Sequence, residues 1–239
     1  ITNEKHNDAE IYSISPEPIM QALLENTVPV IAGFQGITQS GRLTTLGRGG
    51  SDTTAVAVSI AIKADFCEIY TDVDGVYDAD PKLIQSAQKL DRITYEEMVE
   101  MASSGAKILH PRSAEMAMEA QLKLRILSTL INSSGTLLTS KRDDIILSNK
   151  VVTGIACKSN EIAINIKGFK HKNLLSEIFQ TIANANINVE MITQDNSDSV
   201  TFTVAKYNTR LINILLMQNH HNFASFDIIT DISRISLVG

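Results

Sequence analysis

Apolar positions in the first third of the chain alternate between helical and strand spacing. After Ser15-Pro16-Glu17, one helix is predicted by an apolar stripe of Ile19, Met20, Leu23 and Leu24. The apolar run Val28 to Phe34 then predicts a short buried strand. A glycine-rich loop follows and leads into a second helix to about Ala64, before a strand at Phe66 to Thr71. This order predicts an α/β fold with a parallel sheet.

The same alternation continues through the middle of the chain. Thr94 to Ser104 predicts an amphipathic helix, Pro111 begins another that ends near Ala120, and Lys123 to Leu127 predicts a strand. From Lys141 to Lys150 the sequence becomes polar and charged, which indicates a linker.

A different pattern follows the linker, in the order β-α-β-β-α-β. Its strands are expected around Ile162–Ile166, Ile187–Met191, Val200–Val204 and Phe226–Ile232, and its helices around Leu174–Ile182 and Thr209–Leu216. This order is typical of a ferredoxin-like unit, in which both helices cover one face of the sheet.

Composition excludes several classes of partner. A net charge of −6 and 5% aromatic residues without tryptophan argue against nucleic acid. The longest apolar run, Ala55 to Ile62, is too short to span a membrane, and Ile1 to Glu10 lacks the apolar core of a signal peptide. Cys67 and Cys157 form no pair or metal motif, so we expect reduced thiols and a cytoplasmic protein.

The glycine-rich loop is the first candidate binding site. It reads Leu-Gly-Arg-Gly-Gly-Ser-Asp-Thr-Thr-Ala from Leu46 to Ala55, with Ser51 or Asp52 as the predicted helix cap. Free amides at a helix start, beside the guanidinium of Arg48, suit a carboxylate or phosphate. Taken alone, such a loop is more often a solvated turn. The whole string, however, closely resembles the signature of aspartate kinases.

A second candidate is the acidic stretch from Thr71 to Lys82. An EF-hand beginning at Asp72 would need an oxygen ligand at Val76, glycine at Tyr77 and a carboxylate at Leu83, and all three fail. An isolated stretch of this kind would read as a solvated loop. The string Thr-Asp-Val-Asp-Gly-Val-Tyr resembles the aspartate-kinase segment that lines the nucleotide site. That resemblance implies ATP contacts by four residues: Thr71, Asp72, Tyr77 and Lys82.

The third candidate is Gly-Ala-Lys-Ile-Leu-His-Pro, from Gly105 to Pro111. It resembles the aspartate-kinase segment whose lysine lies at the nucleotide phosphates, which implies nucleotide contacts by Lys107 and Ile108. We interpret His110 as a helix-start residue, because phosphoryl transfer to a carboxylate removes no proton.

The carboxyl-terminal pattern resembles the amino-acid-sensing ACT domain of aspartate kinases, notably at Val152–Ile155 and Asn186–Ile192. The resemblance implies feedback binding of lysine or threonine and oligomerisation through ACT domains. Backbone amides from Gly168 to Asn173 are candidates for the effector carboxylate, and Asn188 and Gln194 for its polar groups.

We therefore predict residues 1–142 as the nucleotide-binding portion of an amino-acid kinase domain with helices on both sheet faces. Residues 143–232 are then an ACT domain and residues 233–239 the start of a second one. The family's amino-terminal Lys-Phe-Gly-Gly strand is missing upstream of Gly33. The chain resembles an aspartate kinase truncated at both ends, and we expect it to be poorly active by itself.

The resemblance implies transfer of the ATP γ-phosphoryl group to the β-carboxylate of L-aspartate, with Mg²⁺, at the entry to lysine, threonine and methionine synthesis. Arg48, Gly49, Gly50 and Ser51 would bind aspartate, while Asp52 and Lys107 would act at the transferred phosphoryl group. Two alternatives are another amino-acid kinase of this fold and a non-catalytic regulatory subunit. The Arg48 loop and the attached sensor domain argue against the first. The nucleotide motifs retained within residues 28–127 argue against the second.

Overall fold

The computed structural model describes residues 1–140, 151–170, 173–196 and 198–239. They form two compact units, which we call the amino-terminal unit (Ile1–Ala156 with Ser236–Gly239) and the carboxyl-terminal unit (Cys157–Ile235). The predicted linker from Lys141 to Lys150 lies outside the described residues. Our domain boundaries at 142 and 232 stay predictions.

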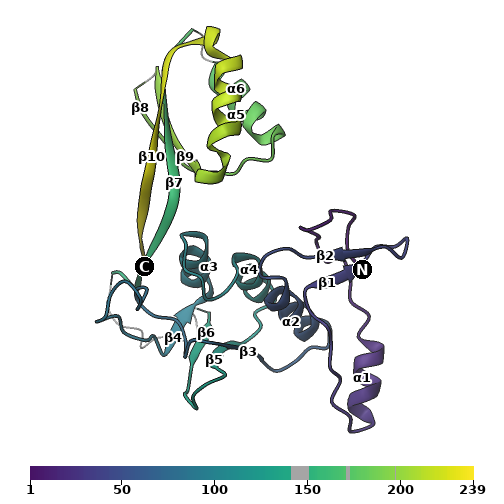
Figure 1. The fold of residues 1–239 in the computed structure, drawn as a ribbon. Coiled ribbons are helices and arrows are strands. Elements are labelled where there is room, and N and C mark those ends of the chain that lie inside the picture. Colours follow the sequence, from purple (N-terminus) through teal and green to yellow (C-terminus); the bar gives the residue numbers. More distant parts are fainter. Residues whose placement is uncertain (141–150, 171–172, 197) are drawn as a thin grey trace. The chain divides into compact units, whose positions relative to one another are not determined.

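The amino-terminal unit contains two sheets and four helices among its described residues. A hairpin of β1 (Gln35–Ile37) and β2 (Leu43–Thr45) is separate from a four-stranded sheet of order β3-β5-β6-β4 (Figure 1). The elements of that sheet and the helices are α1 (Glu17–Leu24), α2 (Gly50–Ala61), β3 (Cys67–Thr71), β4 (Arg92–Thr94), α3 (Tyr95–Ser103), α4 (Pro111–Glu119), β5 (Leu124–Ser128) and β6 (Thr136–Thr139).

The sheet is mixed, and one of its faces carries the helices. β3 pairs parallel with β5 and β4 pairs parallel with β6, while β5 and β6 are antiparallel. Buried side chains of α2, α3 and α4 form one core with the sheet, including Val56, Met98, Ala114, Ile69 and Ile126. The α/β class is therefore confirmed, but the expectation of a parallel sheet is wrong, because β5 and β6 are antiparallel. Among the described residues, α2, α3 and α4 cover one face of this sheet and not both, and they support the loops that precede α2 and α4.

Local signals explain where the third helix begins. The Thr94 hydroxyl accepts a hydrogen bond from the Glu97 amide at 3.2 Å, and the Glu97 carboxylate accepts one from the Thr94 amide at 2.9 Å. This reciprocal capping satisfies two amides that a helix start leaves without a partner. Predicted helices at Thr94–Ser104 and after Pro111 are both confirmed.

The predicted strand Val28 to Phe34 is wrong. These residues form no strand, and Val28 and Val30 are 87% and 96% exposed. Pro29 removes one ladder donor, and no described strand pairs with this stretch. An apolar run becomes a strand only where a neighbour accepts its hydrogen bonds, so the pattern alone was insufficient. The preceding helix α1 is confirmed, although it buries none of its residues.

The carboxyl-terminal unit has the predicted ferredoxin-like order. Its sheet runs β10-β7-β9-β8, and α5 and α6 share one buried core with it, which includes Ile164, Phe202, Ile178 and Ile212. Its elements are β7 (Gly154–Phe169), α5 (Leu174–Asn184), β8 (Val189–Asn196), β9 (Ser199–Ala205), α6 (Thr209–Gln218) and β10 (Phe223–Val238). β10 runs through residues 233–238, and their assignment to a second ACT domain stays a prediction.

The opposite face of this sheet carries buried polar groups. Glu161 is 1% exposed and lies 3.4 Å from the Arg234 guanidinium, while Lys158 is 2.7 Å from Glu190. Thr203 is 2% exposed, and its hydroxyl has no hydrogen-bond partner.

None of the helices in the described parts of the chain is long and apolar enough to cross a bilayer.

Candidate functional site

Chain connectivity brings three predicted ligand segments to one edge of the β3–β5 pair. The two strands are parallel, and Thr71 lies opposite Ser128 at their carboxyl ends. α2 leads through a short connection into the amino end of β3, and α4 leads in the same way into β5 (Figure 1). Each helix therefore runs from the carboxyl edge of the sheet back to its amino edge, so its first turn lies toward the carboxyl edge. The glycine-rich loop precedes α2, the Lys107 segment precedes α4 and the acidic stretch follows β3. Open α/β sheets bind ligands at this edge.

The glycine-rich loop takes a conformation that side chains would block. Gly47 and Gly49 have φ of +76° and +69°, in the left-handed region that favours glycine. A Cβ on Gly49 would lie 2.3 Å from the Cβ of His110, so the loop packs directly on the start of α4. Arg48 and Ser51 are exposed, and Gly50 is buried. The loop therefore has a fixed backbone and presents two free polar side chains.

The predicted cap of α2 by Ser51 or Asp52 is wrong. The helix begins one residue after Gly49, which is its cap and makes no side-chain hydrogen bond. Ser51 and Asp52 both fall within the first helical turn, where their side chains are too late in the sequence to act as cap. Asp52 still complements the helix dipole at this end.

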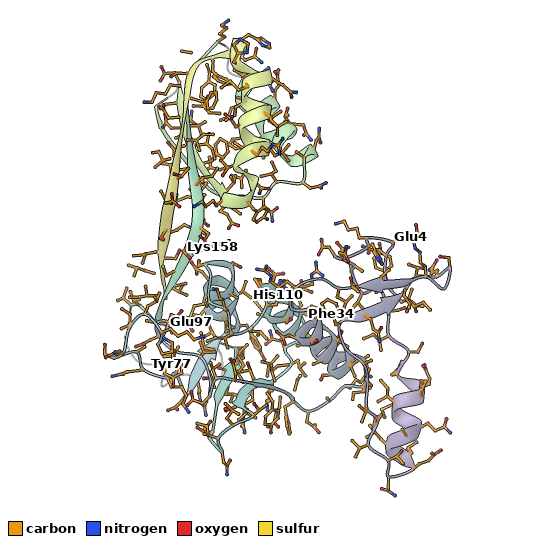
Figure 2. The ribbon with its side chains drawn as sticks, viewed as in Figure 1. Glu4, Phe34, Tyr77, Glu97, His110 and Lys158 are labelled. Carbon is orange, nitrogen blue, oxygen red and sulfur yellow. The ribbon has the colours of Figure 1, made fainter. Side chains whose placement is uncertain are left out.

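Asp52 in the first turn of α2 interacts with His110 at the start of α4 through a hydrogen bond and through charge. Burial raises the pKa of Asp52, and a hydrogen bond from the His110 backbone and the imidazole charge partly offset that rise. Burial and the Arg112 charge lower the pKa of His110. His110 is labelled in Figure 2. Its Nδ1 accepts the Arg112 amide hydrogen at 3.3 Å, which makes His110 the cap of α4, in agreement with the predicted helix-start role.

The lowered pKa of His110 predicts a pH dependence of folding. The ordinary pKa of histidine is 6.5, and in the folded chain the pKa of His110 lies below it. Between these two pKa values the unfolded chain binds more protons at His110 than the folded chain, so the free energy of unfolding should rise with pH. Asp52 has the opposite effect, because its pKa in the folded chain is raised above the ordinary value of 3.8. Above pH 3.8 the folded chain binds more protons at Asp52 than the unfolded chain, so this group lowers the free energy of unfolding as the pH rises. We expect His110→Gln to reduce the rise between about pH 5 and about pH 7.5, measured by urea denaturation.

His6→Gln is the matched control, since His6 is exposed in the same unit. An equal pH dependence in wild type and His110→Gln would contradict the assignment.

The acidic stretch is folded by its own aspartates. The Tyr77 hydroxyl donates to Asp74 Oδ1 at 2.8 Å, which raises the pKa of Tyr77, and the Gln88 amide donates to Asp78 Oδ1 at 2.7 Å. Asp72 and Lys82 are exposed. Asp74 and Asp78 thus fix the loop, and Asp80 also accepts the Lys82 amide hydrogen at 2.9 Å. The charged groups that the stretch exposes to solvent are Asp72, Asp80 and Lys82.

Thr136 on β6 anchors this stretch from a distant part of the sequence. Its buried hydroxyl accepts the Val76 amide hydrogen at 2.8 Å and donates to the Leu90 carbonyl. Gly75 packs against the same hydroxyl, because a Cβ there would lie 2.5 Å from Thr136 Oγ1. No sequence motif marks this residue, because its partners lie 46 and 60 positions earlier in the chain.

The remaining predicted residues differ in their surroundings. Lys107 is exposed, and Ile108 packs against the core of the amino-terminal unit. Asn188 and Gln194 are exposed in the carboxyl-terminal unit. The Gly168 amide donates to the Asp198 carbonyl at 2.7 Å and is thereby occupied, and residues 171–172 lie outside the described residues.

Comparisons with known proteins agree on one family. Residues 1–128 match the model of the amino acid kinase family. The chain is 39% identical to an aspartokinase of Corynebacterium glutamicum and 40% identical to an aspartate kinase of Pseudomonas putida. Both matches cover 100% of this chain, but 59% and 60% of the relatives. The chain spans about three fifths of their length.

Solved structures show the same relationship. E. coli aspartokinase III in complex with aspartate and ADP matches 100% of this chain and 55% of its own, with a TM-score of 0.81 and 28% identity. The same enzyme in complex with lysine and aspartate matches with a TM-score of 0.76. An aspartate kinase of Clostridium acetobutylicum matches 94% of this chain with a TM-score of 0.79 and 27% identity.

Proposed function

Because the chain belongs to the amino acid kinase family, we propose that the protein carrying it is an aspartate kinase. The reaction is transfer of the ATP γ-phosphoryl group to the β-carboxylate of L-aspartate, giving 4-phospho-L-aspartate. The observation that carries this proposal is the glycine-rich loop, which has a fixed backbone and presents exposed Arg48 and Ser51 at the carboxyl edge of the sheet. A guanidinium beside a helix start is suited to a dicarboxylate substrate.

The proposed roles follow from position and charge. Arg48 and Ser51 bind aspartate, and Gly49 and Gly50 let the backbone come close to it. The Gly50 amide donates to the Gly47 carbonyl at 3.1 Å, so it fixes the loop and is not itself a donor to the substrate. Asp52, at the first turn of α2, orients cationic groups, and Lys107 neutralises phosphate charge.

Nucleotide contacts come from residues that flank this pair of segments. Thr71, Asp72, Tyr77 and Lys82 hold the nucleotide from the acidic stretch, and Ile108 lines it from the start of α4. All of them lie in the segments that chain connectivity brings to the carboxyl edge.

Mg²⁺ fits this arrangement as an ion held by the nucleotide. Among the described residues, no three histidine, cysteine, aspartate or glutamate side chains form a metal-binding group. Mg²⁺ in kinases uses one or two carboxylates plus substrate phosphates and water, and the exposed Asp72 is the suitable carboxylate here. When bound, the ion supplies charge neutralisation at the phosphates.

The test is a substrate panel on the full-length protein that carries this sequence. ADP release is measured with aspartate, glutamate, acetylglutamate or a nucleoside monophosphate as acceptor. ADP release dependent on aspartate, with hydroxylamine trapping of the acyl phosphate, supports the proposal. Turnover with another acceptor and none with aspartate contradicts it.

Replacing Lys107 with alanine should weaken Mg-ATP binding to the 239-residue chain. Loss of a hydrogen bond to a charged group costs about 1.5–3 kcal/mol, or roughly a tenfold to hundredfold loss of affinity. Isothermal titration calorimetry measures it. Lys123→Ala is the matched control, because Lys123 precedes β5 at the opposite edge of the sheet. Equal affinities would remove Lys107 from the site.

We further propose that the carboxyl-terminal unit is an ACT domain that binds lysine or threonine and contributes to oligomerisation. Its β-α-β-β-α-β order and the lysine complex of the related E. coli enzyme support this. Asn188 and Gln194 are its candidate polar contacts. Scanning fluorimetry of the full-length protein should show a higher melting temperature with the effector, and Gln194→Ala should reduce the shift. No shift with lysine, threonine or methionine would contradict the regulatory proposal alone.

A further inference from the structure

Arg112 joins three segments that are far apart in the sequence. Its Nη1 donates to the carbonyl oxygen of Ala9 at 3.2 Å and of Leu46 at 3.5 Å, and its Nη2 donates to Asp8 Oδ1 at 3.0 Å. Ala9 and Leu46 are 0% and 1% exposed, while the Arg112 side chain is 29% exposed. A single guanidinium therefore satisfies two buried backbone acceptors and one surface carboxylate.

These contacts hold the entrance of the glycine-rich loop. Leu46 directly precedes Gly47, and a Cβ on Gly47 would lie 2.6 Å from the carbonyl oxygen of Asn7. The Ala9 amide in turn donates to the Thr45 carbonyl at 3.0 Å. The segment from Asn7 to Ala9 and the start of the loop thus form one packed layer, and Arg112 fastens that layer to α4.

The exit of the loop is held by the same turn of α4. Gly49 packs on His110, and the Thr53 hydroxyl lies 3.2 Å from the Ser113 hydroxyl in a buried contact. Because both ends of the loop rest on residues 110–113, α4 determines where Arg48 and Ser51 are placed.

The chemistry selects arginine at this position. A guanidinium offers five N–H donors in a planar fork, whereas lysine offers one compact ammonium on a flexible stem. An ammonium has three donors but only one nitrogen, so it lacks the two separate nitrogens with which the guanidinium meets the carbonyls and the carboxylate. Each buried carbonyl left without a donor is strongly disfavoured. A purely structural arginine would stabilise the whole unit. A loop anchor would act on the loop selectively.

We infer that Arg112 is the positioning residue of the glycine-rich loop, and that it sets Arg48 and Ser51 for recognition of the acidic substrate. The second part of this inference rests on the proposed aspartate kinase function. Arg112 is itself no substrate contact in this scheme, since its N–H donors serve Ala9, Leu46 and Asp8.

Limited trypsin digestion of the 239-residue chain tests the structural part. Arg48 is exposed in the loop, and a protease must draw the segment into an extended strand before cutting after it. Arg112→Met should accelerate cleavage between Arg48 and Gly49 by at least about tenfold. It removes the donors to both buried carbonyls, and the loss of even one such donor shifts a local opening equilibrium by roughly that factor. Arg112→Lys should give an intermediate rate.

Two controls make the result specific. Asp8→Asn retains both carbonyl contacts, and Arg125→Met removes an exposed arginine from β5, so both should cleave after Arg48 at the wild-type rate. An unchanged rate in Arg112→Met overturns the inference. If Arg112→Met does not fold, Arg112→Lys decides, and a wild-type rate there has the same meaning.

Kinetics of the full-length protein test the functional part. Arg112→Lys should raise the KM for aspartate about tenfold while leaving the KM for ATP unchanged, whereas a general loss of folded protein would lower kcat without this split. Faster cleavage in a protein that phosphorylates a different acceptor would leave the loop anchor standing and overturn the proposed function. An unchanged KM for aspartate, in a protein that does phosphorylate it, would overturn the inference alone.

Discussion

Gly49→Ala is expected to lower the free energy of unfolding of the amino-terminal unit by about 2–5 kcal/mol. The left-handed backbone costs an L-residue roughly 1–2 kcal/mol, and overpacking against His110 adds roughly 1–3 kcal/mol. The clash involves the His110 Cβ at 2.3 Å, which cannot move without displacing the start of α4. In the full-length protein, displacement of the loop that carries Arg48 and Ser51 should also reduce aspartate turnover by roughly a hundredfold, the effect of misplacing a substrate-positioning group.

The matched control for this change is Gly41→Ala. Gly41 also has a left-handed φ, of +84°, but a Cβ there meets no atom within 4 Å. It should show only the backbone cost of about 1–2 kcal/mol. Urea denaturation followed by tyrosine fluorescence reports on the amino-terminal unit, because Tyr207 is the one tyrosine outside it. Equal losses in both variants would show that the loop does not depend on its contact with His110.

Thr136→Val should destabilise the same unit by about 2–6 kcal/mol, since it leaves one buried and one partly buried backbone group unpaired at roughly 1–3 kcal/mol each. The two side chains have nearly the same shape, so packing changes little. The Val76 amide and the Leu90 carbonyl lose their shared partner, and the acidic stretch loses its anchor on β6. Mg-ATP binding, measured by calorimetry, should weaken along with stability.

Thr203→Val makes the same chemical change where the hydroxyl has no partner. Thr203 is 2% exposed in the carboxyl-terminal unit, and its hydroxyl makes no hydrogen bond. Removing a buried hydroxyl without a partner should leave the melting temperature unchanged or raise it. A comparable loss at Thr203 and Thr136 would mean that the hydrogen bonds of Thr136 do not carry its effect.

Sequence patterns predicted those elements whose signals are local. The β-α-β-β-α-β order emerged from alternating Ile162, Ile164 and Ile166 and from apolar residues at helical spacing, because each pattern is completed within one element. The helix at Tyr95–Ser103 emerged for the same reason. The strand predicted at Val28 to Phe34 failed because a strand depends on a partner strand elsewhere.

Residues of the candidate site were likewise predictable only where their signal is local in the sequence. Resemblance to a signature located the glycine-rich loop, the acidic stretch and Lys107, all of which are continuous strings. Arg112 and Thr136 were missed because each acts through backbone groups at least 46 positions away, and nothing in their neighbourhood marks them. The role of Gly49 as cap could have been anticipated, since a glycine directly before a helix start competes with serine or aspartate at that position.

The distance in sequence between the ligand loops and their anchors also affects the order of events during synthesis. The Leu46 carbonyl is hydrogen-bonded by Arg112, which is synthesised 66 positions later, and the Val76 amide is hydrogen-bonded to Thr136, which is synthesised 60 positions later. A chain emerging from the ribosome can form α2 or α3 locally, but contacts between distant residues carry a loop-closure cost and form late. The glycine-rich loop would therefore remain open on the nascent chain until α4 has been translated, and the acidic stretch until β6 has been translated. Ligands that need both loops could stabilise the unit only after that point.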